Sequence, residues 1–252
     1  MSARGEAIPV PVEAGAAKAA QPALVTADIL PFPEAPADPA FEGLLAGIRG
    51  KSATLVAKRA LDIVVAIIAL IVLAVPLLLV TLLVRLTSAG PAIFRQKRAG
   101  LRGKVFTIYK FRSMYVAEQD LSGIKHTVKD DPRVTPLGLI LRKYSLDELP
   151  QLVNVLKGDM SIVGPRAHAI GMKALGVPYH VLVRDYSLRH LVRPGITGLA
   201  QIRGFRGEVD TEAHARGRIA NDLDYVRGLS IWSDVKIMVL TIPAVISGRA
   251  AY

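Results

Sequence analysis

Two adjacent carboxylates, Asp147 and Glu148, stand just ahead of a proline in the stretch SLDELPQL, residues 145–152. Carboxylates can attack phosphorus and can hold Mg²⁺ beside a phosphate, so a neighbouring pair is able to carry out phosphoryl chemistry. A purely structural role is also open, because Ser145 and Glu148 have the S-x-x-E spacing of a helix capping box. Pro150 argues against that box, since proline fits poorly at the fifth position of a helix capped by Ser145.

Cationic residues elsewhere in the chain could neutralise such phosphates. Lys110 and Arg112, in the run YKFRSM, are two residues apart and therefore point to the same side of a strand. Two aligned cations at this spacing could clamp a diphosphate. Further candidates for phosphate contacts lie in a loop-rich stretch and are Arg193, Arg203 and Arg206.

The net charge also indicates an anionic partner. The chain has a formal charge of +11, and its first 50 residues carry three basic and six acidic side chains, a net −3 that leaves +14 on residues 51–252. Such an excess suits nucleic acid, an anionic lipid surface or a phosphorylated substrate, although a solubilising surface charge gives the same count. The absence of cysteine excludes disulfides, thiolate catalysis and cysteine-ligated metals. The five histidines show no metal-ligand spacing.

The first 50 residues are predicted to form a disordered tail. They contain seven of the 16 prolines and no sustained apolar run, a composition typical of segments that cannot bury a core. No apolar segment follows Arg4 near the N-terminus, so a cleaved secretory signal is not expected.

An uncharged apolar run, IVVAIIALIVLAVPLLLVTLLV, extends from residue 63 to residue 84. A helix of that length would measure roughly 33 Å, close to the roughly 30 Å of a bilayer's hydrocarbon core. We therefore expect a membrane segment, with a buried core helix as the alternative, and we expect Pro76 to break it. Basic residues crowd both flanks, whereas a simple span has them mainly on one side. This pattern favours a re-entrant helix, and a kinked span remains open.

The sequence after the apolar run predicts short strands and helices separated by loops. Residues 92–96 and 105–111 are rich in β-branched and aromatic side chains and predict a hairpin, whose basic side chains could meet anionic headgroups. Residues 137–141 have helical spacing, and another helix is expected to begin at Pro150 and to end at Gly158. The stretches GDMSIVGPRA and RPGITGLAQIRGFRGEVDT predict loops, and one or two helices follow.

Taken together, residues 58–246 resemble the bacterial polyprenyl-phosphate sugar-1-phosphate transferases, the monotopic phosphoglycosyl transferases. The resemblance rests on KRALDI with the proline-broken apolar run, GPAIFRQKRAG, VFTIYKFRSM, DPRVTPLGLILRKYSLDELPQLVNVLKGDMSIVGPR, RPGITGLAQI and DLDYVRGLSIWSDVKIMVLT. The range 58–246 makes up about three quarters of the chain. The run GFRGEVDT further resembles the subgroup that transfers glucose-1-phosphate in exopolysaccharide synthesis.

The resemblance implies transfer of a sugar phosphate from a UDP-sugar to undecaprenyl phosphate, with release of UMP and with Mg²⁺ as cofactor. By analogy with the family, Asp147 is the nucleophile that forms a covalent phosphosugar intermediate, and Glu148 helps to hold the metal. A further acidic site residue corresponds to Asp222, and the membrane helix is expected to re-enter at Pro76. The family's phosphate-binding cations correspond to Lys110, Arg112, Arg142 and Arg166.

These patterns and the resemblance predict an α+β fold that is mainly helical. We expect a tail over residues 1–50, a re-entrant membrane helix over residues 51–90, and a catalytic domain over residues 91–252 with a small β-hairpin and interfacial amphipathic helices. The resemblance places this domain on the cytoplasmic face of the bacterial inner membrane, against anionic lipid. No nucleic acid partner is expected, and a homodimer remains open.

Two positions depart from the family pattern. Ala167 follows Arg166 where the family usually has a second proline, so that wall of the nucleotide site could differ in shape. Val75 stands where many members have serine before the helix-breaking proline. Two other functions stay open on charge and spacing alone: a membrane-bound, Mg²⁺-dependent phosphohydrolase of nucleotide-sugars, and a non-catalytic membrane anchor with a basic surface for nucleic acid.

Overall fold

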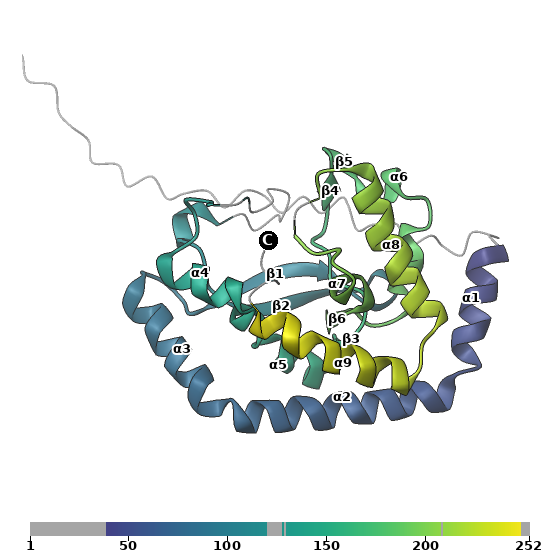
Figure 1. Cartoon of the computed structure of the whole chain (residues 1–252), viewed down its shortest axis with the longest axis horizontal. Helices are drawn as coiled ribbons and strands as arrows, with labels where there is room; N and C mark the ends of the chain where they lie inside the picture. Colours follow the sequence, from purple (N-terminus) through teal and green to yellow (C-terminus); the bar gives the residue numbers. More distant parts are fainter. Residues whose placement is uncertain (1–38, 120–127, 129, 208, 248–252) are drawn as a thin grey trace, which may run out of the picture.

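A computed structural model of the chain describes residues 39–119, 128, 130–207 and 209–247. The fold is mixed α/β and mainly helical, as predicted. Figure 1 shows α2 (Ser52–Val72) along the lower edge, α3 (Ala74–Thr87) turning up from it, and most other elements on one side of this pair. The described strands form three separate two-stranded sheets, so helices and loops supply most of the packing.

The described chain begins inside the predicted tail. Residues 39–49 form helix α1 (Pro39–Arg49), and the side chains of Phe41 and Ile48 are buried in the main core. The prediction of a disordered tail up to residue 50 is therefore wrong for these residues. Phe41 and Ile48 are seven positions apart and lie on one helix face, a signal that the proline-rich stretch before them obscures. Residues 1–38 lie outside the described residues.

The apolar run forms two helices, α2 and α3, that meet at a bend of 65°. The break falls at Leu73, three residues before Pro76. Proline lacks an N–H, and its ring crowds the carbonyl four residues earlier, which belongs to Val72, so the interruption precedes the proline itself. No single described helix is long and apolar enough to cross a membrane, whereas the bent pair meets that criterion when its two helices are taken together.

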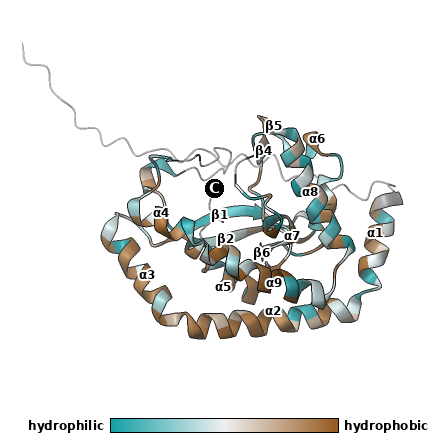
Figure 2. Ribbon diagram, viewed as in Figure 1, coloured by the Kyte–Doolittle hydropathy of each residue, from teal (hydrophilic) through white to brown (hydrophobic). Residues whose placement is uncertain are grey.

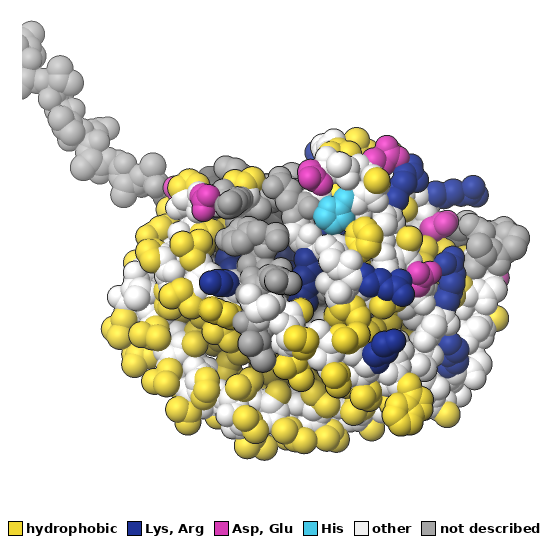
Figure 3. Space-filling view, viewed as in Figure 1, with side chains coloured by type: hydrophobic (Ala, Val, Ile, Leu, Met, Phe, Trp, Pro, Cys, Tyr) yellow, Lys and Arg dark blue, Asp and Glu magenta, His cyan; other side chains and the backbone are white. Residues whose placement is uncertain are grey.

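Both helices of the bent pair expose apolar side chains. Figure 2 shows hydrophobic residues concentrated along α2 and α3, and Figure 3 shows hydrophobic side chains covering the same edge of the surface. Ile71, Leu78 and Leu86 are each at least 70% exposed. Because burying one such side chain is worth roughly 1.5–3 kcal/mol, water is an unfavourable surrounding for this edge.

The hairpin predicted after the bent pair is present. Strands β1 (Ile93–Ala99) and β2 (Val105–Phe111) are antiparallel and turn through η1 (Leu101–Gly103). Residues directly opposite each other in such a pair, including Phe94 and Lys110, point to the same face of the ribbon.

The elements around the acid pair follow in the chain. They are the turn η2 (Val116–Glu118), α4 (Pro136–Lys143), the 3-10 turn η3 (Leu146–Glu148) and α5 (Gln151–Lys157). Helix α5 begins one residue after Pro150 and ends at Gly158, whose φ of 88° is left-handed, which agrees with the prediction. Thr135 caps α4 by accepting a hydrogen bond from the Gly138 amide at 2.9 Å.

The C-terminal half supplies the remaining elements. They are β3 (Ser161–Val163), β4 (Lys173–Ala174), β5 (Val177–Pro178), α6 (Tyr179–Leu182), η4 (Tyr186–Leu191), β6 (Gly195–Thr197), α7 (Leu199–Ile202), α8 (Glu212–Arg227) and α9 (Ile231–Ile246). Strands β3 and β6 pair in parallel, and β4 pairs with β5. Figure 1 shows α9 next to α2 and below β3 and β6, and it packs against all three.

Two hydrophobic cores hold these elements together. The main core joins side chains from α1, α2, β2, α5, β3, η4, α8 and α9. A smaller core contains Val84, Ala92, Phe111 and Leu141 and joins the end of α3 to the hairpin and to α4. Leu146, the residue before the acid pair, packs against this smaller core, so the position of the acids depends on the bent pair as well as on the hairpin.

Basic side chains fix the first half of α2 to the rest of the fold. Lys58 is buried, forms an ion pair with Asp234 at 2.6 Å, and donates a hydrogen bond to the Val163 carbonyl at 2.9 Å. Arg59 donates to two carbonyls at the end of α5. Lys51 donates to the carbonyl of Arg227, which ends α8, and to that of Leu229, two residues later. These three flanking cations of the apolar run therefore have partners within the protein.

Candidate active site

Asp147 and Glu148 lie in η3, between α4 and α5. Ser145, just before this turn, has a left-handed backbone with φ of 54°, and its side chain makes no capping hydrogen bond. The capping-box interpretation of the acid pair is therefore contradicted. Both acids are buried, with exposed fractions of 8% for Asp147 and 9% for Glu148, and burying two carboxylates is unfavourable unless cations compensate them.

Two cations contact Glu148 directly. Lys110 Nζ, from β2, donates to Oε1 at 2.7 Å. Arg166 donates through Nη2 to Oε1 at 2.6 Å and through Nη1 to Oε2 at 3.2 Å. Burial opposes the charged form of Glu148, but Arg166 and Lys110 outweigh it and hold the pKa of this carboxyl well below its usual range. Glu148 is therefore ionised at neutral pH.

Asp147 lies beside this cluster but has no cation bonded to it among the described residues. Within the described ranges, no hydrogen bond or ion pair reaches its carboxyl group, although Lys110, Arg142 and Arg166 act on it electrostatically. Burial raises the pKa of Asp147 to about 6; Lys110 opposes this shift and the charge of Glu148 adds to it. The carboxylate is thus mostly charged at neutral pH, and its oxygens are free to attack an electrophile.

Further arginines bring positive charge to the acid pair. Arg142, from α4, acts on Asp147, while Arg98, from β1, and Arg206, from the loop before α8, act on Glu148. Together with Lys110 and Arg166, these cations outnumber the two carboxylates. Such an excess of buried or partly buried cations suits a ligand that carries several negative charges.

The loop that carries Arg166 is fixed by close backbone packing. A Cβ on Gly164 would lie 2.4 Å from the Arg193 carbonyl oxygen, and a Cβ on Gly195 would lie 2.1 Å from the Gly164 nitrogen. The β3–β6 pairing therefore requires glycine at both positions. The runs IVGPR and RPGITG were predicted as loops, but each contains part of a short strand. Strand β3 ends just before Gly164, and strand β6 begins at Gly195.

Two arginines hold the backbone of this loop by its carbonyls. Arg189 Nη2 donates to the Arg166 carbonyl at 2.6 Å, and Arg98 Nη1 donates to the Ala167 carbonyl at 3.1 Å. Ala167, which departs from the expected pattern, is buried at 5% exposure. Burial and the neighbouring Arg166 lower the pKa of Arg98 to about 10, so it remains a cation at neutral pH.

Asp222 is linked to the site through Arg189. Its Oδ2 accepts a hydrogen bond from Arg189 Nε at 2.8 Å, and both side chains are at most 3% exposed. Burial raises the pKa of Asp222, and Arg189 acts in the opposite direction. Because Arg189 also binds the Arg166 carbonyl, Asp222 orients the arginine that fixes the Arg166 loop and does not itself contact the acid pair.

Arg112 does not join Lys110 in a clamp. Its side chain is buried at 2% exposure, and its Nη2 donates to the carbonyls of Val84 and Ser88 at 3.0 Å and 2.6 Å. These carbonyls belong to the last turn of α3 and the residue that ends it, where backbone acceptors lack helical partners and attract cations. The predicted diphosphate clamp is therefore contradicted, and Arg112 instead fixes the end of the bent pair to the hairpin.

The family resemblance named Asp147, Glu148, Lys110, Arg142 and Arg166 as site residues, and these five lie near one another in the structure. It did not name Arg98 or Arg189. Gln96 and Arg98 alternate in β1 as two polar residues on one strand face, which is a weak signal of a polar site. Arg189 lies within the run SLRHL, and nothing in its local sequence indicates an ion pair with a residue 33 positions away.

Comparison with known proteins identifies the family of the chain. The bacterial sugar transferase family matches residues 53–248. The exopolysaccharide production protein PSS of Rhizobium leguminosarum bv. phaseoli is 55% identical over 188 residues, which are 75% of this chain and 94% of that protein. The chain belongs to the bacterial sugar transferase family and is a phosphoglycosyl transferase by class.

Two longer relatives have more specific names. An undecaprenyl-phosphate glucose phosphotransferase of Komagataeibacter xylinus is 47% identical over 195 residues, 77% of this chain and 37% of that protein. A UDP-glucose:undecaprenyl-phosphate glucose-1-phosphate transferase of Escherichia coli (strain K12) is 49% identical over 195 residues, 77% of this chain and 41% of that protein. The chain thus spans about two fifths of these two relatives.

Proposed function

We propose that this enzyme transfers glucose-1-phosphate from UDP-glucose to undecaprenyl phosphate and releases UMP, as the first step in assembling an exopolysaccharide or another glycoconjugate. The names of the relatives support this donor and this acceptor. The observation that carries the proposal is a buried acid pair whose two carboxylates have different partners. Two cations form ion pairs with Glu148, and Asp147 has no direct partner in the described residues.

In the first step, an Asp147 carboxylate oxygen attacks the phosphorus that bears the sugar. A bond forms between that oxygen and phosphorus, while the bond from phosphorus to the UMP oxygen breaks and UMP leaves with its electron pair. Lys110, Arg166 and Arg142 lie around the acid pair, and their charge stabilises the negative charge on the phosphoryl oxygens in the transition state.

In the second step, an oxygen of the lipid phosphate attacks the same phosphorus. The bond from phosphorus to Asp147 breaks, the carboxylate is regenerated, and the sugar remains on the lipid through a diphosphate. Using one carboxylate as a relay divides a difficult displacement into two easier ones. The same cations serve both steps, because both leaving groups and both nucleophiles are anions.

The acid pair also fits Mg²⁺. This ion is commonly bound by one or two carboxylates and by substrate phosphates, and no described group of three His, Cys, Asp or Glu side chains offers a fuller set of protein ligands. Glu148 would hold the ion together with the substrate phosphates, which leaves Asp147 to react, and the ion would supply charge neutralisation to the diphosphate. Lys110 and Arg166 keep Glu148 in the deprotonated state that a metal ligand requires.

We further propose that the bent α2–α3 pair enters the bilayer and returns to the cytoplasmic face of the inner membrane. Both ends of the pair are bonded to the same folded unit, through Lys58 to Asp234 at one end and through Arg112 to Ser88 at the other. A helix that crossed the bilayer would separate these contacts. A domain held at the membrane surface meets a lipid phosphate in a nearly intramolecular encounter.

Purified enzyme incubated with UDP-glucose, undecaprenyl phosphate and Mg²⁺ tests the proposal. We expect release of UMP, a glucose-diphosphate lipid identified by mass, and, without acceptor, a hexose-phosphate adduct on the polypeptide. Asp147→Asn should abolish all three, while Asp185→Asn, an exposed carboxylate outside the site, should leave them unchanged. Hydrolysis of UDP-glucose at equal rates with and without lipid would identify a phosphohydrolase instead.

A further inference from the structure

Three arginines in the second half of the chain were candidates for phosphate contacts, and the structure gives them different surroundings. Arg193 Nε donates to the Gly158 carbonyl at 2.9 Å, and Arg203 Nη1 donates to Asn221 Oδ1 at 2.7 Å. Arg206 is half-buried and has no hydrogen bond or ion pair with any described residue, and its Nε is shielded from solvent without a partner. A buried donor of this kind is unfavourable unless a ligand supplies the acceptor.

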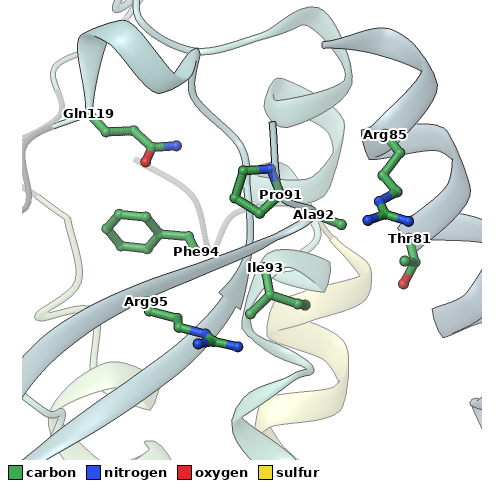
Figure 4. A pocket seen from close by; sticks show the side chains of 8 residues that line it. All are labelled: Thr81, Arg85, Pro91, Ala92, Ile93, Phe94, Arg95 and Gln119. Atoms are coloured by element: carbon green, nitrogen blue, oxygen red, sulfur yellow. The ribbon is translucent and has the colours of Figure 1, made fainter. Parts of the chain in front are cut away.

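Arg95, another cation near the hairpin, faces away from the acid pair. Together with Arg85 it lines a cavity of about 590 Å³ between α3 and the start of β1, as Figure 4 shows. Arg95 lies opposite Tyr109 in the hairpin register, whereas Lys110 belongs to the next pair along the ribbon. Successive residues of a strand point to opposite faces, so Arg95 is not on the face from which Lys110 contacts the acid pair.

The backbone on both sides of Arg206 is held by a single arginine of α8. Arg218 is 4% exposed, and it donates through Nε to the Phe205 carbonyl at 3.0 Å and through Nη2 to the Gly207 carbonyl at 2.9 Å. A guanidinium presents its donors in a rigid, planar fork. Because one such fork binds the carbonyls before and after Arg206, this loop holds Arg206 in a fixed place.

The sequence of α8 makes room for this loop. A Cβ on Gly217 would lie 2.3 Å from Phe205 Cε1, so the phenyl ring rests directly on the bare backbone of the helix. The ring also lies near the His214 ring, with 5.5 Å between their centroids. Glycine weakens a helix relative to alanine, and here it stands at the position where the residue before Arg206 packs against α8.

Arg206 lies on the Glu148 side of the acid pair. Burial lowers the pKa of Arg206, the charge of Arg166 acts in the same direction, and Glu148 opposes both, so these two residues are its charged neighbours. The cations that act on Asp147 come instead from β2, from α4 and from the Arg166 loop. Arg206 is therefore a cation of the site that is placed away from the nucleophile.

The two ends of the reacting phosphoryl group need different partners. The attacking and leaving oxygens lie roughly in line on opposite sides of phosphorus, so the group displaced by Asp147 moves away from that residue. Figure 1 shows the N-terminal end of α8 pointing away from α2, which places the loop before α8 on the side of the domain away from the bent pair. A water-soluble nucleotide reaches this side without crossing the apolar edge.

We propose that Arg206 binds the phosphate of the nucleoside monophosphate that leaves in the first step. As the bond from phosphorus to the UMP oxygen breaks, the electron pair stays on UMP, and Arg206 stabilises the charge that develops there. The inference rests on the proposed function, because it assigns a residue to the leaving group of that reaction. It gives Arg206 a role in the first step and none in the second, since UMP has departed when the lipid phosphate attacks.

Arg206→Gln tests this difference between the two half-reactions. With UDP-glucose alone, we expect formation of the hexose-phosphate adduct to slow about tenfold to hundredfold, as for loss of one charge-assisted hydrogen bond. The adduct, accumulated without acceptor and freed of UMP by gel filtration, should then react with undecaprenyl phosphate at the wild-type rate. This second rate also shows that the variant is folded.

Arg216→Gln is the matched control, because Arg216 is an exposed arginine on α8 whose side chain pairs with Glu212. It should leave both rates unchanged. Equal slowing of the two half-reactions in Arg206→Gln would show that Arg206 supports the site as a whole, and an unchanged first rate would show that it does not touch the leaving group. Either result would overturn the inference.

Binding of UMP tests the same contact without chemistry. Titration calorimetry should show that Arg206→Gln binds UMP about tenfold or more weakly than the wild type does, by the same loss of one charge-assisted bond. The affinity for uridine, which lacks the phosphate, should not change. A variant that loses affinity for uridine as well as for UMP would contradict the assignment of Arg206 to the phosphate.

Gly217→Ala tests the packing that places Arg206. Alanine is the better helix former, but its methyl group would collide with the Phe205 ring and displace the loop. We expect slower adduct formation and an unchanged second half-reaction. Gly47→Ala, in α1, adds a Cβ with no atom within 4 Å and should change neither rate. A wild-type first rate in Gly217→Ala would contradict the inference.

The two experiments on Arg206→Gln separate failure of the inference from failure of the proposed function. If the variant forms the adduct and binds UMP as the wild type does, the inference is wrong and the proposed reaction stands. If the variant selectively loses affinity for UMP but the wild type forms neither adduct nor lipid product, Arg206 is a phosphate-binding residue and the proposed reaction is wrong.

Discussion

Lys110 Nζ lies 2.7 Å from Glu148 Oε1, so this lysine forms its ion pair with Glu148 and not with Asp147. The two side chains are 16% and 12% exposed. Burial lowers the pKa of Lys110, and Glu148 opposes that shift. Asp147 experiences Lys110 as a nearby charge and not as a bonded partner, which leaves its oxygens available and makes its pKa depend on its neighbours.

The rate of adduct formation should fall on the acid side of about pH 6. Asp147 attacks as a carboxylate, and burial raises its pKa to about 6, so each pH unit below that value should lower the rate roughly tenfold. Above it the rate should level off. Rapid-quench measurement of the adduct in single turnovers, between about pH 5 and pH 8, checks this profile.

Lys110→Met should move this acid limb to higher pH. The Lys110 charge lowers the pKa of Asp147, and removing it leaves the effects of burial and of Glu148 less opposed. The maximal rate should also fall, but the pH of the limb is the informative quantity. Lys104 is an exposed cation in the hairpin turn, and Lys104→Met should leave the pH of the acid limb unchanged. A limb unchanged in Lys110→Met would mean that Asp147 does not control the profile.

Asp222→Asn should slow adduct formation without changing a substrate contact. Arg189 would lose its charged partner while still lying next to the Arg166 carbonyl, so the Arg166 loop would be less well fixed. We expect about a tenfold to hundredfold loss, as for small displacements of groups that position substrate. The measurement is the single-turnover rate with UDP-glucose, taken at a temperature where circular dichroism shows the variant folded.

The conservative change Asp222→Glu is the control for this prediction. Glutamate keeps the negative charge, so it should restore more activity than asparagine does if the ion pair with Arg189 is what matters. Equal rates for the folded asparagine variant and the wild type would show that the Arg166 loop is fixed without Asp222.

Local signals in the sequence predicted the elements that carry the acid pair. The β-branched and aromatic residues of 105–111 placed Lys110 in a strand, and Pro150 with Gly158 bounded the helix after the acids. These signals act over a few residues, through backbone preferences that operate before tertiary contacts form. The existence of both elements was therefore predictable, whereas the first strand of the hairpin, expected at residues 92–96, extends to Ala99.

The misassigned residues are those whose partners lie far away in the chain. Arg112 was predicted to face phosphates from its spacing relative to Lys110 and from the family resemblance, whereas its actual acceptors are carbonyls 24 and 28 residues earlier. Lys58 was counted as a membrane flank, although its partner Asp234 is 176 residues away. A sequence shows the charge of a side chain, but the partner of that side chain depends on the tertiary fold.

The Lys58–Asp234 pair should be important for stability. The ion pair of 2.6 Å is buried, and Asp234 is also bonded to the Tyr225 hydroxyl at 2.8 Å. Lys58→Met would leave a buried carboxylate without its cation, which costs about 3–5 kcal/mol of unfolding free energy. Thermal unfolding in detergent, followed by circular dichroism, measures the loss.

Two further variants test whether the unpaired charge causes this loss. Adding Asp234→Leu to Lys58→Met removes the stranded carboxylate and should recover much of the stability. Lys236→Met, an exposed cation on α9, should change stability by no more than about 0.5 kcal/mol. If Lys58→Met unfolds at the wild-type temperature, the pair does not hold α2 to the domain.

Cysteine labelling should find both ends of the α2–α3 pair on one side of the membrane, because contacts at each end reach the same folded unit. The chain has no cysteine, so Gly50→Cys and Ala89→Cys each introduce one reactive site; position 90 is unsuitable, since a Cβ there would meet Arg112 at 2.6 Å. Both should react with an impermeant maleimide in inside-out vesicles and resist it in right-side-out vesicles. Ala74→Cys, at the bend, should react only after detergent is added, since an inserted thiol is shielded from water. Reaction of positions 50 and 89 from opposite sides would establish a span and would require the contacts at one end of the pair to break.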